Sequence, residues 1–315
     1  MSAAAPSARV EPGALERRLH ALLDERYHDQ HPFNLRMHAG ALTPDELRRW
    51  VRNRYYYQTR IPIKDGVILA KSEDREFRRS WIRRIADHDG DAQREGGLEL
   101  WLKLADAVGL DRREVASLRN VLPGVRRACD AYVELVTSSD LLASVAASLT
   151  EARAGTLLGL RAAAFEKHYG WIAPAGLAYF RSRTTQAPRD AAEGMAFVLA
   201  HARTPADAER CAAALARKCE ILWALLDAVE WGGTKPRLAP AAQLRENEPL
   251  VVLPERAVKL TGSGREILAA CSGTRSIEEV AAFLRARHPD AENVERDCYE
   301  FLEQMQKLGV IEAPA

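Results

Sequence analysis

One stretch of this chain places polar side chains where a buried helix face would need apolar ones. In residues 50–63 (WVRNRYYYQTRIPI), that face would carry Trp50, Arg54, Tyr57, Gln58 and Ile61. Their spacing of i, i+4, i+7, i+8 and i+11 is typical of a core stripe. Burying an arginine without a partner costs several kcal/mol. We therefore expect Arg54 to meet either an internal carboxylate or a bound anionic ligand.

Three later stretches also place charged or hydrogen-bonding side chains together on one helix face. They carry Arg84 with His88, Tyr179 with Arg183 and Gln186, and Lys218 within an apolar run. Each set alone fits a solvated face or an internal ion pair. Together they predict a cationic pocket that also holds tyrosines and a histidine, which would suit a substrate with several carboxylates.

The common catalytic motifs are missing. The chain contains no G-x-G-x-x-G, G-x-x-x-x-G-K-[ST], G-x-S-x-G or H-E-x-x-H, so nucleotide, serine-hydrolase and zinc-protease sites are unsupported. A carboxylate-bridged di-iron bundle would need a pair of Glu-x-x-His motifs on facing helices, which the chain lacks. His28 or His31 could ligate haem, but a hydrogen-bonded core or surface role is the commoner one. We therefore expect no metal site.

Composition indicates a globular protein without a polyanionic partner. The 315 residues are 47% hydrophobic and 28% charged, enough for one large core and a small second domain. The formal net charge is +1, and residues 235–315 hold 11 basic against 13 acidic residues, so we expect neither nucleic acid nor membrane as a partner. Five scattered cysteines without a C-x-x-C pair, and no secretory segment, predict a cytoplasmic protein.

Helix signals are dense up to residue 232. Thr43, Pro44 and Glu46 combine an N-cap, a proline at the first helical position and a capping-box glutamate, which predicts a helix start. Further helices are predicted over residues 75–88, 97–108, 112–118, 125–137, 141–168, 177–185, 190–202 and 205–229. Breaks are predicted at Gly90, Gly96, Gly109, Pro123 and Pro188. The fold class is therefore mainly α, with a compact bundle of about seven helices.

Glycine and proline mark the limits of this bundle. Residues 1–13 are small and unpatterned, which predicts a disordered leader, so the all-α domain is expected over residues 14–232. A linker follows over residues 233–240, where glycine gives way to proline. Residues 241–315 then form a second domain.

This second domain has a different pattern. Residues 250–253 and 257–260 have the composition of strands, and capping-box matches at Ser263 and Ser276 each predict a helix start. A last helix is predicted near residues 293–308. The pattern predicts a small winged-helix-like α+β module. Its acidic excess disfavours DNA binding, because lysine and arginine supply most of the affinity for phosphates.

Several strings of the first domain closely resemble the pyrroloquinoline-quinone synthase family. They are residues 27–33 (YHDQHPF), 53–58 (NRYYYQ), 61–65 (IPIKD), 87–90 (DHDG), 121–126 (VLPGVR), 148–151 (SLTE) and 179–183 (YFRSR). The resemblance runs in order from about residue 14 to residue 232. Residues 253–255 (LPE), 267–273 (ILAACSG) and 309–311 (GVI) are similar to the small chaperone of the same pathway, which binds the precursor peptide.

The resemblance implies a haem-oxygenase-like fold and a cofactor-free oxidase. Such enzymes close the last ring of a tricarboxylated bicyclic precursor and oxidise it to pyrroloquinoline quinone, with dioxygen as co-substrate and hydrogen peroxide as by-product. The catalytic residues would be His88 as general base, Glu151, Tyr179, Arg183, Tyr132 and Lys218. Substrate would be bound by Tyr27, His28, Arg54, Gln58, Lys64, Arg84 and Arg161. The implied partners are the precursor peptide, the radical-SAM protein of the pathway and a second copy in a homodimer.

Leu158 departs from the family pattern. Family members carry a histidine seven residues after the glutamate of the SLTE string, and this chain has Leu158 there. A leucine cannot donate or accept a proton. The alternatives are therefore an impaired or non-catalytic protein that binds quinone or precursor, and a metal-dependent oxidase on the same scaffold. A thiaminase-like enzyme would need a nucleophilic cysteine, but packing roles are favoured for Cys129 and Cys219.

These hypotheses share one structural prediction. Five cationic side chains should converge on a single cavity and not form separate surface pairs: Arg54, Arg84, Arg161, Arg183 and Lys218.

Overall fold

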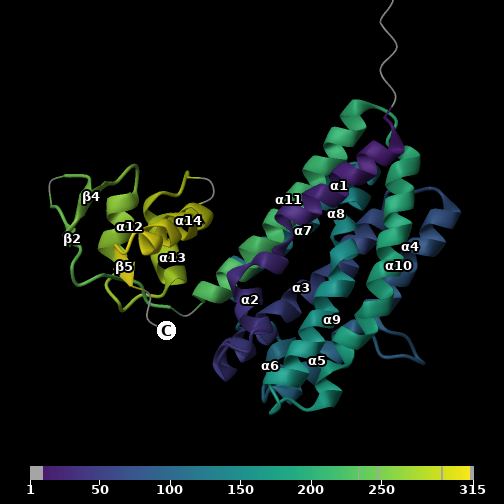
Figure 1. Cartoon of the computed structure of the whole chain (residues 1–315), viewed down its shortest axis with the longest axis horizontal. Helices are drawn as coiled ribbons and strands as arrows, with labels where there is room; N and C mark the ends of the chain where they lie inside the picture. The colour runs from purple at the N-terminus through teal and green to yellow at the C-terminus, as the bar shows by residue number, and fades with distance from the viewer. Residues whose placement is uncertain (1–9, 233, 247, 292–293, 313–315) are drawn as a thin grey trace, which may run out of the picture. The chain divides into compact units, whose positions relative to one another are not determined.

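The computed structural model describes residues 10–232, 234–246, 248–291 and 294–312. The chain divides into two compact units, and each is considered by itself (Figure 1). The first unit extends to Val121 and resumes over Val125–Leu226, and the second contains Leu122–Gly124 and the residues from Asp227 onward.

The first unit consists of helices joined by short connections (Figure 1). Its α-helices are α1 (Pro12–Arg26), α2 (Pro32–His38), α3 (Pro44–Ala70), α4 (Arg75–Asp89), α5 (Gly97–Ala107), α6 (Arg112–Ala116), α7 (Pro123–Ser138), α8 (Leu141–Ala147), α9 (Glu151–His168), α10 (Ala178–His201) and α11 (Pro205–Trp231). Short 3₁₀ helices are η1 (His28–Gln30), η2 (Ser148–Thr150) and η3 (Pro174–Leu177). The predicted mainly α class is confirmed, and α1 and α2 add to the predicted helices.

The leader prediction is partly wrong. Residues 1–9 lie outside the described part of the chain, but α1 begins at Pro12, inside the predicted leader. Glu11 caps this helix, because its carboxylate accepts a hydrogen bond from the backbone N–H of Gly13. Leu15, Leu19 and Leu23 then form a narrow buried stripe along α1.

Helix α3 is the central element for the site. The capping box of Thr43 and Glu46 is present, and Pro44 occupies the first turn as predicted. The helix continues through Pro62 and packs against α4 and α5. Trp50 lies in an aromatic cluster, with its ring centroid 5.3 Å from that of Trp101 on α5. This packing fixes the face of α3 that carries the polar stripe.

The predicted break at Pro188 is wrong, because α10 runs through it from Ala178 to His201. Proline removes a backbone hydrogen bond and crowds the preceding turn. The Pro188 ring packs over Gly155 of α9, where a β-carbon would lie 3.1 Å from the proline Cγ. The missing side chain of Gly155 thus gives the ring room, and packing between α9 and α10 keeps the helix continuous.

The predicted single helix over residues 141–168 is also wrong, because η2 separates α8 from α9. Ser148 in η2 is buried, and its Oγ accepts a hydrogen bond of 3.1 Å from Lys64 Nζ. Its Oγ also lies 3.2 Å from the hydroxyl of Tyr132 on α7. These partners are distant in sequence, which is why local periodicity does not predict the break. The break places Glu151 at the start of α9.

The second unit contains short strands and three further helices. β1 (Arg237–Leu238) pairs antiparallel with β5 (Ile311–Glu312), and β2 (Gln243–Leu244), β3 (Leu250–Leu253) and β4 (Arg256–Lys259) form an antiparallel sheet in the order β2-β3-β4. The helices are α12 (Gly264–Ala270), α13 (Ile277–Arg287) and α14 (Val294–Lys307). β3, β4 and the helices match the predictions within one or two residues.

Three two-residue strands, β1, β2 and β5, were not predictable from composition because pairing defines them. β1 therefore lies inside the predicted linker, which is wrong at residues 237–238. The capping box at Ser276 is present, whereas Ser263 makes no capping hydrogen bond and its ψ of 4° is not that of an N-cap. The predicted capping box at Ser263 is thus wrong, although a helix does begin there.

Among the described residues, no helix combines the length and the apolar character needed to cross a membrane.

The two serines provide a matched stability test. Ser276→Ala removes the capping box and should lower the free energy of unfolding of the second unit by about 1 kcal/mol. Ser263→Ala should leave it within about 0.5 kcal/mol of the wild type, because no capping bond is lost. Hydrogen exchange of the α12–α14 amides, followed by mass spectrometry, measures both. Equal effects of the two substitutions would contradict the capping assignment.

Candidate active site

A cavity of about 40 Å³ lies among the helices of the first unit. It is lined by Tyr27, His28, Arg54, Tyr57, Gln58, Ile61, Trp101, Thr150, Glu151, Ala154, Leu157, Leu158, Arg161, Tyr179, Arg183 and Leu222. These residues come mainly from α3, η2, α9 and α10. One part of the lining is charged or hydrogen-bonding, and another part is apolar.

Eight of the thirteen predicted site residues line this cavity: Tyr27, His28, Arg54, Gln58, Glu151, Arg161, Tyr179 and Arg183. The other five are buried but are not part of the lining: Lys64, Arg84, His88, Tyr132 and Lys218. The predicted convergence of five cations is therefore right for Arg54, Arg161 and Arg183. Arg84 and Lys218 are buried in the surrounding core and do not form surface pairs.

Arg183 is held by carboxylates on two sides. Its Nη2 donates a hydrogen bond of 2.7 Å to Glu151, and its Nη1 lies 3.4 Å from Asp190. Burial alone would raise the pKa of Glu151, but the charge of Arg183 outweighs this and the pKa is lowered. Glu151 is therefore ionised at neutral pH, and Arg183 has its charge balanced within the protein.

Arg54 and Arg161 differ from Arg183, because no carboxylate among the described residues pairs with either. Arg161 donates a hydrogen bond of 2.8 Å to the side-chain oxygen of Asn34. Burial, and then repulsion from Arg54, lower the pKa of Arg161 to about 9. The Arg54 guanidinium lies 3.8 Å from the centroid of the Tyr57 ring, a cation–π contact. Two arginines thus face the cavity without a compensating acid.

Hydrogen-bonding groups accompany these arginines. The Tyr179 hydroxyl donates to Gln58 Oε1 over 2.8 Å, which links α10 to α3. The Nδ1 atom of buried His28 has no hydrogen-bond partner among the described residues. Burial, and then the charge of Arg54, lower the pKa of His28 well below its usual value, so the ring is neutral. A neutral imidazole with an unused nitrogen could donate to or accept from a ligand.

Lys64, Lys218 and Tyr132 form a polar layer in the core next to the cavity-lining Tyr57. Lys64 Nζ pairs with the buried Asp65 carboxylate at 2.7 Å. Lys218 Nζ donates to the Tyr57 hydroxyl over 3.0 Å and lies 3.6 Å from the centroid of the Tyr132 ring. Burial lowers the pKa of both lysines, most strongly that of Lys218.

The pKa of His88, the residue expected to act as general base, lies far below neutrality. Burial, and then the charge of Arg183, lower its pKa to about 3. Its Nδ1 donates a hydrogen bond of 3.0 Å to the carbonyl of Arg84, and its Nε2 has no partner in the described part of the chain. His88 is therefore neutral at physiological pH. Its role as a general base stays a prediction.

Some lining residues were not predicted as site residues. Tyr57 and Ile61 lie on the predicted α3 stripe, and their spacing from Arg54 was the signal that could have found them. Trp101 comes from an element without a polar pattern, and Leu222, Ala154 and Leu157 look like ordinary core residues. Tertiary packing brings these four side chains to the cavity.

The cysteines do not offer a nucleophile near the site. All five are buried. Burial raises the pKa of the Cys129 thiol to about 12 and that of Cys219 to about 11, which disfavours the reactive thiolate. Among the residues described, no group of three histidine, cysteine or acidic side chains is arranged to hold a metal ion.

The helical architecture of the first unit resembles that of proteins with a haem-oxygenase-like fold. A domain from Shewanella denitrificans described with this fold aligns with a TM-score of 0.58 and 14% identity, over 70% of this chain and 92% of that one. A TenA homologue from Pseudomonas syringae aligns with a TM-score of 0.56 and 13% identity, over 73% of this chain and 98% of that one. The predicted fold is therefore confirmed.

Sequence comparison gives the family. The sequence model of the TENA/THI-4/PQQC family matches residues 16–228, and that of Coenzyme PQQ synthesis protein D (PqqD) matches residues 250–311. The chain belongs to the TENA/THI-4/PQQC family and carries a PqqD module.

Individual relatives agree with this assignment. The pyrroloquinoline-quinone synthase of Rhizobium meliloti is 46% identical over 230 residues, which cover 73% of this chain and 90% of that protein. The bifunctional coenzyme PQQ synthesis protein C/D of Methylorubrum extorquens is 43% identical over 237 residues, 75% of this chain and 64% of that protein. The predicted combination of two pathway proteins in one chain is confirmed.

The two uncompensated arginines can be tested with a simple ligand. Arg54→Gln and Arg161→Gln should each weaken the binding of benzene-1,3,5-tricarboxylate by about 10- to 100-fold, because each removes a charged hydrogen-bond donor. Isothermal titration calorimetry measures the affinity.

Arg60→Gln is the matched control, since Arg60 lies on α3, pairs with Asp130 at 3.6 Å and does not line the cavity. It should change the affinity by less than about threefold. A loss as large as that of Arg54→Gln would mean that general charge, and not the cavity, attracts the ligand.

Proposed function

We propose that this chain catalyses the final ring closure and dioxygen-dependent oxidation in pyrroloquinoline quinone biosynthesis, and that its second unit binds the precursor peptide. The observation that carries the proposal is the pair Arg54 and Arg161, which line the cavity and have no carboxylate partner among the described residues. A tricarboxylated substrate would supply the missing negative charge. The relatives named pyrroloquinoline-quinone synthase support the same activity.

Substrate binding requires the cavity to widen. Its volume of about 40 Å³ leaves room for about three water molecules, whereas sites for small molecules are typically roughly 300–1,000 Å³. A bicyclic tricarboxylate would displace this water and lie between the arginines and the apolar side chains of Ile61, Leu157 and Leu222. Its carboxylates would meet the arginines, and its ring faces would meet the apolar wall.

The oxidation needs groups that move protons. Dioxygen takes up two electrons and two protons from the substrate to give hydrogen peroxide. Tyr179 places a hydroxyl group at the cavity wall, and its hydrogen bond to Gln58 orients that group. Glu151 is ionised and fixed by Arg183, so it can accept a proton. The reaction as proposed uses no metal or organic cofactor.

Leu158 limits which groups can transfer protons during the proposed reaction with dioxygen. It lines the cavity beside Leu157 and offers no proton. We infer that Tyr179 and ordered water take the part of the histidine that the family resemblance implies at this position. A protein that binds the quinone or its precursor without turnover is the second candidate, and Leu158 is the observation that favours it.

The second unit is proposed to bind the precursor peptide, since residues 250–311 match PqqD. The radical-SAM protein that acts on this peptide would then be a further partner. We also propose a homodimer in the cytoplasm.

A single-turnover experiment tests the proposed activity. Metal-analysed protein is mixed anaerobically with the bicyclic precursor and then exposed to dioxygen, while quinone absorbance and hydrogen peroxide are recorded. Metal-free protein should give both the quinone and hydrogen peroxide. A spectrum that changes on binding but never becomes that of the quinone would support the binding-protein alternative instead.

Deleting residues 237–315 separates the roles of the two units. The truncated chain still contains residues 16–228, which match the model of the TENA/THI-4/PQQC family. It should keep the rate of quinone formation within about threefold, because the cavity lining ends at Leu222. Affinity for the precursor peptide should be lost. Loss of quinone formation in a folded truncated chain would show that the second unit completes the active site.

A further inference from the structure

Six side chains of alternating charge form a continuous series of ion pairs from the cavity wall to the surface. In order, they are Glu151, Arg183, Asp190, Arg189, Asp87 and Arg94. The successive nitrogen–oxygen distances are 2.7, 3.4, 2.6, 2.6 and 3.4 Å. Glu151 and Arg183 line the cavity, whereas the Arg94 side chain is 57% exposed. The series connects α9, α10, α4 and the loop after α4.

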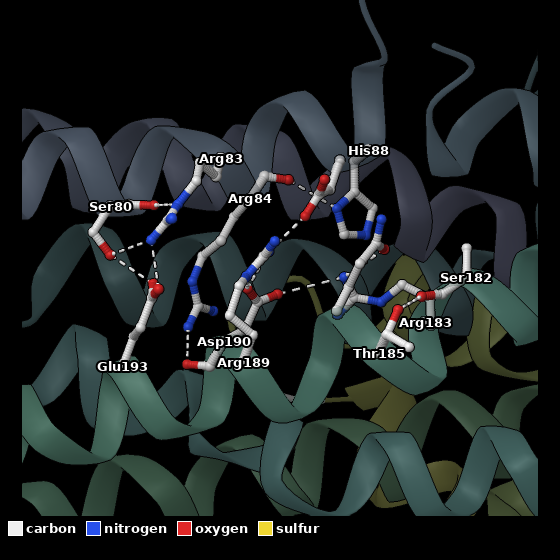
Figure 2. A network of polar contacts seen from close by, with 12 residues as sticks. Ser80, Arg83, Arg84, His88, Ser182, Arg183, Thr185, Arg189, Asp190 and Glu193 are labelled. Atoms are coloured by element: carbon white, nitrogen blue, oxygen red, sulfur yellow. Dashed lines mark hydrogen bonds and ion pairs between the residues drawn. The ribbon is translucent and has the colours of Figure 1, made fainter.

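Asp190 is the central member of this series. Its buried carboxylate accepts hydrogen bonds from Arg189 Nε at 3.1 Å and Nη2 at 2.6 Å, and it also contacts Arg183. Its backbone carbonyl accepts a hydrogen bond from Arg84 of α4. Figure 2 shows these groups between α4 and α10. One residue thus fixes two buried arginines.

The outer part of the series holds Asp190 in place. Arg189 donates to Asp87 on α4 over 2.6 Å, so Asp190 is tied to the neighbouring helix through Arg189. Asp87 is buried and also pairs with Arg94. Because each carboxylate in this region faces arginines, burial of the charges is compensated at every step.

The three cavity arginines consequently differ in charge balance. Arg183 has Glu151 on one side and Asp190 on the other, whereas neither Arg54 nor Arg161 pairs with a carboxylate in the described part of the chain. Burial alone would lower the pKa of Arg183, but the negative charge of Glu151, and after it that of Asp190, raises it. An arginine already neutralised in this way attracts a substrate carboxylate weakly, but it keeps a fixed direction for its N–H groups.

We propose that Asp190 is a positioning residue for the reaction. It holds Arg183, with Glu151, beside Tyr179 at the cavity wall, and it prevents Arg183 from becoming a third anchor for substrate carboxylates. The inference rests on the proposed function, because the oxidation is the step that a fixed Arg183 would serve. According to this inference, substrate binding depends on Arg54 and Arg161, whereas turnover depends on Asp190.

Asp190→Asn tests this separation in the full-length protein. The substitution keeps the size of the side chain and removes its charge, so Arg183 is released toward the cavity. The rate constant of quinone formation in a single turnover should fall by about 10- to 100-fold, as expected for a misplaced group. The affinity for pyrroloquinoline quinone, measured by absorbance titration, should rise by about threefold or more.

Glu193→Gln is the matched control. Glu193 lies one turn further along α10, accepts hydrogen bonds from Ser80 and Arg83 of α4 and is not connected to the cavity (Figure 2). This variant removes a charge from the same pair of helices, so the rate constant and the affinity should both stay within about twofold of the wild type.

Two results would overturn the inference: an unchanged rate constant in Asp190→Asn, or equal losses of rate and affinity, which indicate structural damage. Should Asp190→Asn not fold, Asp190→Glu replaces it. That variant keeps the charge but displaces it, so the rate constant of quinone formation should fall while the affinity for pyrroloquinoline quinone is retained. An unchanged rate constant, or equal losses of rate and affinity, would overturn the inference for this variant too. Absence of quinone from the wild type would contradict the proposed function, and weaker binding by Asp190→Asn would still contradict the positioning role.

Discussion

The structure depends on how buried positive charge is balanced inside a helical bundle. Desolvating a guanidinium is costly, and an internal carboxylate can offset the cost only if its geometry is good. Arg183 meets this condition with Glu151 and Asp190. Arg54 and Arg161 do not, and burial, followed by repulsion from Arg54, lowers the pKa of Arg161. The cavity therefore contains positive charge that the protein does not balance, and a bound anionic ligand would neutralise it. This excess of positive charge is the basis for the proposed substrate class.

Packing contacts away from the charged side chains fix the positions of the helices that carry them. Aromatic contacts around Trp50 fix the rotation of α3, and hence the direction of Arg54 and Gln58. The 3₁₀ turn at η2 places Glu151 at the start of α9, within reach of Arg183. The close approach of Gly155 to Pro188 allows α10 to continue past a proline, which keeps Arg183 and Asp190 on one helix. Loss of any of these contacts would misplace a charged group without touching the cavity itself.

Local sequence patterns predicted the parts of the site that lie on one helix. The spacing of Arg54 and Gln58 on α3 and of Tyr179 and Arg183 on α10 gave their common faces, and the capping box fixed the start of α3. Family resemblance supplied Glu151 and Arg161. The low pKa of His88 was not predictable, because it depends on burial by other helices. The same holds for Asp190, because its partner Arg189 also pairs with Asp87, which lies 102 positions away on α4.

A structure of the complex with pyrroloquinoline quinone would test the central claim most directly. The account predicts ligand carboxylates within hydrogen-bond distance of Arg54 and Arg161, a widened cavity, and an Arg183 that still pairs with Glu151 and Asp190. A ligand bound elsewhere, or bound with both arginines turned away from its carboxylates, would contradict the claim that uncompensated positive charge defines this site.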